Sequence, residues 1–114
     1  MSINTQTIAL GFSVAAQLSV ALIADAAALG FKSLINNRPD GEGGPDQPKS
    51  VEIAAAAQAY GLHYVYLPVV SGSITTEQAA AMREALQTAP QPVLAFCRSG
   101  ARSAQLYSLA QMAA

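Results

Sequence analysis

The chain has little of the chemistry on which many protein sites depend. Its 114 residues include one cysteine, Cys97, one histidine, His63, and no tryptophan. A single cysteine excludes an internal disulfide, and one further histidine is too few for a cysteine- or histidine-rich metal site. The sequence therefore predicts neither a bound metal nor another cofactor.

Charge is also scarce. Charged residues make up 11 % of the chain and the formal net charge is −1, whereas an average globular domain has roughly 25 % charged residues. No basic excess is present to bind a nucleic acid or an anionic lipid surface. The longest apolar run, residues 20–31, is too short to span a bilayer, and the N-terminal residues do not have the pattern of a signal peptide. We expect a cytoplasmic protein with no nucleic-acid or membrane partner.

Apolar residues are abundant at 52 %, and 24 of them are alanine, which favours helices. Predicted strands alternate with predicted helices, which indicates an α/β fold with a small, mostly parallel sheet flanked by helices. The strands are expected at 12–15, 31–36, 62–67 and 93–96, and the helices at 20–29, 51–60, 75–88 and from 101 onward.

The length suits one domain, 1–114, which is either complete or part of a longer, fused protein. The low charge and high alanine content would also suit a helix-mediated homodimer. Residues 37–48 form the one long loop, and their glycine, proline and acidic residues predict an exposed and mobile segment.

The single cysteine lies where an α/β protein places its ligands, between a buried strand and a helix. Backbone N–H groups of such a turn and the positive end of the helix bind anions, and the same features lower a cysteine pKa to about 3.5–7.5. Gly100 allows a positive φ, and Arg102 offers a planar fork to two oxygens of an anion. Cys97 and Arg102 are therefore the candidate catalytic residues, although a buried structural cysteine is the alternative. The candidate substrate contacts in the loop are Arg98, Ser99, Gly100, Ala101 and Ser103.

One residue outside this loop is also a candidate for substrate binding. Arg38 follows a predicted strand, so its guanidinium would lie at the same sheet edge as the cysteine loop, either as a second anion contact or as a brace through Glu42. Arg98 is expected to point away from the anion, toward solvent or a larger substrate. His63 is expected to be packed in its strand rather than to act as a base.

The cysteine loop, residues 97–103, resembles the active-site loop of rhodaneses, which have four residues between the cysteine and the position matching Arg102. Tyrosine and dual-specificity phosphatases have five. With residues 30–42 and 66–69, the chain resembles a bacterial family, the phosphatase-like domain of beta-lactamase-hydrolase-like proteins, also described as sulfurtransferases. The resemblance implies a dual-specificity-phosphatase-like fold that carries a rhodanese-length loop.

Two chemistries and a binding role follow as hypotheses. A phosphatase working through a phosphocysteine needs a general acid for its leaving group, and the loop 69–73 holds none, so Asp40, Glu42 or Asp46 would have to serve. Sulfur transfer from thiosulfate needs no acid, because sulfite leaves as a stable anion. The sequence therefore favours a sulfurtransferase that forms a Cys97 persulfide and passes its sulfur to a thiol acceptor. A phosphatase acting on a phosphoester is the alternative, and a non-catalytic domain that binds a small oxyanion or a partner is the third.

Overall fold

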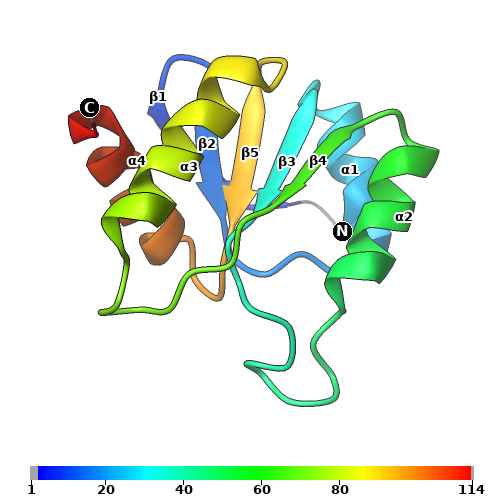
Figure 1. Ribbon diagram of the computed structural model, residues 1–114. Helices are drawn as coiled ribbons and strands as arrows, with labels where there is room; N and C mark the ends of the chain where they lie inside the picture. Colours follow the sequence, from blue (N-terminus) through cyan, green and yellow to red (C-terminus); the bar gives the residue numbers. More distant parts are fainter. Residues whose placement is uncertain (1–2, 114) are drawn as a thin grey trace.

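The computed structural model describes residues 3–113, which form a five-stranded sheet between two layers of helices (Figure 1). The strand order is β1-β2-β5-β3-β4; β1 pairs antiparallel with β2, and the other neighbours are parallel. The predicted α/β fold with a mostly parallel sheet is confirmed. The elements are β1 (Thr5–Ala9), β2 (Phe12–Ala15), the 3₁₀ turn η1 (Val20–Leu22), α1 (Ile23–Ala28), β3 (Ser33–Asn36), α2 (Ser50–Ala59), β4 (His63–Tyr66), α3 (Thr76–Thr88), β5 (Val93–Phe96) and α4 (Ala101–Met112).

Side chains of the central strand β5 alternate between two hydrophobic cores, one on each face of the sheet. Val93 and Ala95 pack on the side covered by α3 and α4. Leu94 and Phe96 pack on the side covered by α1 and α2. All four are at most 1 % exposed, so the strand that leads into the cysteine loop is fixed on both faces.

The parallel pairing brings four chain segments to one edge of the sheet. In register, Ala15 of β2 and Asn36 of β3 each lie beside Phe96 of β5, and Tyr66 of β4 lies beside Asn36. The residues that follow these four strands therefore meet at the carboxyl edge, where open α/β sheets bind their ligands.

The structure differs from the sequence expectations in two elements. Strand β1 was not predicted; it is an exposed edge strand of mostly polar residues, joined to β2 by a tight turn in which Gly11 has φ 78°. The helix expected over 20–29 is shorter, because it begins as a 3₁₀ turn and is α-helical only over Ile23–Ala28. Within residues 3–113, no helix is long and apolar enough to cross a membrane.

Candidate active site

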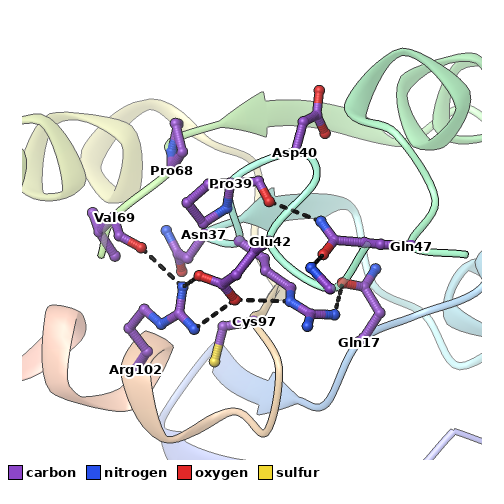
Figure 2. Close-up of polar contacts among 12 residues, drawn as sticks. Gln17, Asn37, Pro39, Asp40, Glu42, Gln47, Pro68, Val69, Cys97 and Arg102 are labelled. Atoms are coloured by element: carbon purple, nitrogen blue, oxygen red, sulfur yellow. Dashed lines mark hydrogen bonds and ion pairs between the residues drawn. The ribbon is translucent and has the colours of Figure 1, made fainter. Parts of the chain in front are cut away.

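Cys97 follows β5 directly and is 1 % exposed. Its loop turns back at Gly100, whose φ of 94° lies in the left-handed region, and α4 begins at the next residue. A Cβ on Gly100 would lie 3.3 Å from the carbonyl oxygen of Ala15, so both the dihedral and the close approach favour glycine. The Gly100 N–H donates to Cys97 Sγ at 3.0 Å, and in Figure 2 the sulfur points into its own loop and away from Glu42.

The cysteine loop holds the thiol in a form that ionises readily. Burial raises the pKa of Cys97, but hydrogen bonds from the backbone N–H groups of Ser103, Ser99 and Gly100 and from the Ser103 hydroxyl outweigh it, and the pKa lies below its ordinary value. The Ser103 hydroxyl has one proton, which it donates to Asn37 Oδ1 at 2.8 Å. We therefore attribute the lowered pKa of Cys97 to the backbone N–H groups.

Arg102 is bound end-on by Glu42, a residue far away in the sequence. Its Nη1 and Nη2 atoms donate to Oε2 and Oε1 of Glu42, each at 2.9 Å, and Nη1 also donates to the carbonyl oxygen of Val69 at 2.9 Å (Figure 2). The Arg102 side chain is 8 % exposed. Planar pairing of this kind fixes the orientation of an arginine as well as its position.

The other edge of the same guanidinium is open. Arg102 Nε is buried and donates to no atom of residues 3–113. A buried donor without an acceptor costs about 1–3 kcal/mol, and such groups in native structures call for an explanation. An anion held in the cysteine loop would supply the acceptor. The sequence predicted that the Arg102 fork faces an anion; because Glu42 occupies the edge between the two end nitrogens, the Nε edge is the one left for a ligand.

The loop 37–48 is tied down over the site. Arg38 Nε donates to Glu42 Oε1 at 2.9 Å, and its Nη1 donates to Gln17 Oε1 at 3.3 Å. Gln47 is 9 % exposed; it donates to the carbonyl oxygen of Pro39 at 2.8 Å and accepts from the N–H of Gly43 at 2.7 Å. The sequence predicted an exposed and mobile segment. Residues 40–43, 45 and 46 are exposed, but these contacts close the loop on itself and tie it to Gln17, which follows β2.

Asn37 connects the cysteine loop to the neighbouring loop after β4. It is fully buried, and its Oδ1 accepts from Ser103 while its Nδ2 donates to the carbonyl oxygen of Leu67 at 2.9 Å. The backbone N–H of Asn37 donates to Phe96 at 2.9 Å, and its carbonyl accepts from Val69 at 3.0 Å. Sequence reasoning missed Asn37, Gln17 and Gln47, because an amide side chain carries no recognisable pattern of its own.

The three general acids suggested from the sequence lie in different surroundings. Glu42 lies between two arginines; hydrogen bonding from Arg102 holds its pKa below the ordinary 4.5, despite an opposing effect of burial. It is therefore a carboxylate at neutral pH. Asp40 Oδ1 accepts from the N–H of Ser50 at 2.8 Å, which commits it to the start of α2. Asp46 is exposed, and no hydrogen bond or ion pair of the described residues involves its side chain.

The remaining candidates are distributed around the loop. Arg98 is exposed, Ser99 Oγ accepts from the Ala101 N–H at 3.4 Å, and Arg38 reaches the site as a brace through Glu42. His63 is exposed at the amino end of the edge strand β4, opposite the cysteine loop, so the expectation that it is packed is wrong. Among residues 3–113, no group of three or more histidine, cysteine, aspartate or glutamate residues could hold a metal ion.

A polar cavity of about 540 Å³ opens at this edge of the sheet. Its walls come from the cysteine loop, the loop 37–48 and the loop after β4, and its lining residues are Arg38, Glu42, Gly43, Ser71, Arg98 and Arg102. Three of the four arginines of the chain thus face one space. The arrangement combines a readily ionised thiol with an excess of positive charge, which suits nucleophilic attack on an anionic substrate.

A cysteine loop of this kind, at the carboxyl edge of this sheet, defines the class of cysteine-dependent, phosphatase-like enzymes. The chain belongs to one family of that class: residues 4–114 match the model of the beta-lactamase hydrolase-like protein, phosphatase-like domain. It is 38 % identical over 99 residues to the beta-lactamase hydrolase-like protein of Agrobacterium fabrum, covering 87 % of this chain and 23 % of that protein. A Xylella fastidiosa counterpart is 42 % identical over 83 residues, or 73 % of this chain and 19 % of that protein. The chain thus spans about a fifth of these curated relatives.

Solved structures support the same assignment of the fold. A candidate phosphatase from Neisseria meningitidis is 32 % identical, with a TM-score of 0.78 and coverage of 85 % of this chain and 68 % of that chain. The core catalytic domain of a PP-IP phosphatase from S. cerevisiae has a TM-score of 0.68 at 14 % identity, covering 88 % of this chain and 59 % of that chain. At that identity, the second likeness concerns the fold alone. The family resemblance seen in the sequence is confirmed.

Proposed function

We propose that this domain is a cysteine-dependent phosphatase. One observation carries the proposal: a buried thiol of lowered pKa lies in a loop that also holds an arginine with a free, buried Nε–H. The family and the fold support this reading over sulfur transfer, which the sequence placed first. The loop N–H groups and Arg102 Nε would stabilise the charge that develops on a phosphoryl group under attack.

In the proposed reaction, the Cys97 thiolate attacks the phosphorus of a phosphoester. The S–P bond forms as the bond from phosphorus to the leaving oxygen breaks, and the electron pair stays on that oxygen. Water then attacks the phosphocysteine, the S–P bond breaks, and inorganic phosphate and the thiolate are released. Arg102 would bind the phosphoryl oxygens through its Nε edge while Glu42 keeps the guanidinium in place.

One specific observation favours sulfur transfer as the second candidate. Of the described residues that line the cavity, Glu42 alone has a carboxyl group, and it is ion-paired with two arginines rather than free to donate a proton; Asp40 accepts a hydrogen bond at the start of α2. Attack of the thiolate on the outer sulfur of thiosulfate would release sulfite, which needs no proton, and leave a persulfide on Cys97.

The two candidates are separated by a side-by-side assay of wild type and Cys97→Ser. The proposal expects hydrolysis of p-nitrophenyl phosphate and a phosphorylated Cys97 in the intact mass after rapid quenching, both lost in Cys97→Ser. Sulfur transfer instead expects one added sulfur atom after incubation with thiosulfate, removed by cyanide. A persulfide without any hydrolysis of the aryl phosphate would overturn the phosphatase proposal.

A further inference from the structure

The cavity beside the cysteine loop is larger than one phosphoryl group requires. At about 540 Å³, it has room for more than ten water molecules at about 30 Å³ each. Its lining includes three arginines and a single carboxylate, that of Glu42. The cavity therefore carries a net positive charge that one singly charged anion bound in the loop would not neutralise.

The three arginines differ in what they already bind. The end nitrogens of Arg102 are held by Glu42 and Val69, and Arg38 is held by Glu42 and Gln17. Arg98 is exposed at the rim, and no carboxylate of residues 3–113 forms an ion pair with it. Its position next to Cys97 in the chain keeps this free cation close to the reacting group.

The carboxylate that lines the cavity is not free to protonate a leaving group. A general acid contributes typically about 10²–10⁴-fold to a rate, and Glu42, the one carboxylate among the lining residues, is ion-paired with two arginines. An alkoxide is a poor leaving group under these conditions. A phosphate is a stable anion at neutral pH, and it would carry the second negative charge that the free Arg98 could bind.

We propose that the substrates are phosphoanhydrides: compounds with a terminal diphosphate whose outer phosphoryl group enters the cysteine loop while the inner phosphate lies against Arg98. This proposal rests on the phosphatase function above. Cys97 attacks the outer phosphorus, the S–P bond forms, and the bridging P–O bond breaks with its electron pair on the inner phosphate. Water then hydrolyses the phosphocysteine. The net reaction is hydrolysis of one anhydride bond, with no oxidation or reduction.

The test compares substrates that share one nucleoside but differ in leaving group. Adenosine 5′-diphosphate and adenosine 5′-monophosphate are assayed for phosphate release, with inorganic pyrophosphate as a second anhydride and p-nitrophenyl phosphate as an activated monoester. EDTA is present to suppress contaminating metal-dependent enzymes. We expect kcat/KM for the diphosphate to exceed that for the monophosphate at least about a hundredfold, the lower range of a general-acid contribution, and to vanish in Cys97→Ser.

Arg98→Gln tests the second anion contact. Because an exposed ion pair contributes up to about 1 kcal/mol, the ratio of kcat/KM for the diphosphate to that for p-nitrophenyl phosphate should fall about fivefold. The matched control is Arg83→Gln on α3, whose arginine donates to Ala110 and lies outside this cavity; it should leave the ratio unchanged.

The outcomes distinguish a failure of the phosphoanhydride proposal from a failure of the phosphatase function. If the protein hydrolyses p-nitrophenyl phosphate but does not prefer adenosine 5′-diphosphate or pyrophosphate over adenosine 5′-monophosphate, the phosphoanhydride proposal is overturned. The phosphatase function would still stand. An unchanged substrate ratio in Arg98→Gln would equally overturn the role of Arg98. If none of the phosphate compounds reacts at Cys97, the phosphatase function itself fails, and the substrate proposal fails with it.

Discussion

Replacing Glu42 with glutamine removes a negative charge from between two arginines. The carboxylate accepts three hydrogen bonds of 2.9 Å, one from Arg38 and two from Arg102. A glutamine side chain keeps one acceptor oxygen, and its amide nitrogen would face a guanidinium donor. Hydrogen bonds to charged groups contribute about 1.5–3 kcal/mol each. Because 28 % of the Glu42 side chain is exposed, solvent screening reduces the expected loss of unfolding free energy to about 1–2 kcal/mol.

The catalytic effect of Glu42→Gln follows from the freed Arg102. A guanidinium that samples several orientations presents Nε to the anion for only part of the time, so kcat/KM should fall about ten- to a hundredfold for every substrate. Cys97 should keep its lowered pKa, because the backbone N–H groups of its own loop cause it. Urea unfolding, steady-state kinetics and the pH dependence of thiol alkylation measure the three quantities. Glu77→Gln, at the exposed start of α3, is the matched control.

The pH dependence of the stability difference has a definite sign. Hydrogen bonding from Arg102 lowers the pKa of folded Glu42 below its ordinary value of 4.5, so its stabilising effect is complete above that value and is lost as the pH falls through the folded pKa. The difference in free energy of unfolding between wild type and Glu42→Gln should therefore be largest at pH 7 and disappear in acid. Two results together would refute the positioning role of Glu42. The first is an unchanged free energy of unfolding in Glu42→Gln. The second is a fall in kcat/KM that is confined to substrates with poor leaving groups and that removes the alkaline limb of the pH–rate profile. That result would identify Glu42 as the general acid.

Three further predictions concern the cysteine loop. Alkylation of Cys97 by iodoacetamide should have its midpoint below the free-cysteine value of about 8.5 and return to it in urea; an ordinary midpoint in the folded protein would contradict the lowered pKa. Arg102→Lys should lower kcat/KM about ten- to a hundredfold, because one ammonium cannot bind Glu42 and Val69 and also donate to the anion as Arg102 Nε does. Unchanged kinetics would show that the guanidinium is dispensable. Gly100→Ala should destabilise the fold by about 1–2 kcal/mol in urea unfolding, because its φ of 94° is left-handed; wild-type stability would contradict that strain.

The sequence predicted the central strand and the cysteine loop because their signals are local. Four apolar residues in succession mark a strand buried on both faces, and Gly100 marks the turn before α4. The start of α3, expected at residue 75, is likewise marked locally, because Thr75 and Gln78 form a capping box there. Strand β1 escaped because Thr5–Ala9 is mostly polar and lies at the exposed edge of the sheet, so its partner strand, rather than an apolar face, determines its conformation.

The contacts of the loop 37–48 could not be read from composition. Its glycines, prolines and acidic residues are those of an exposed segment, and several of them are exposed. Its conformation depends on side chains far apart in the sequence: Tyr66 Oη accepts from the Asp40 N–H at 2.9 Å, and Gln17 accepts from Arg38. These contacts exist only once parallel pairing has brought the ends of β2, β3 and β4 to one edge.

Within the site, the sequence also could not predict which edge of the Arg102 guanidinium binds a ligand. The spacing of Arg102 from Cys97 predicts that its guanidinium faces an anion, but the spacing alone does not say which nitrogens do so. Glu42, sixty residues away, takes the end nitrogens and leaves Nε buried without an acceptor. The ion pair that fixes the arginine therefore also decides which of its donors a substrate can use. For the same reason, the carboxylate that lines the cavity is held ionised, and the proposed reaction depends on the leaving group of its substrate.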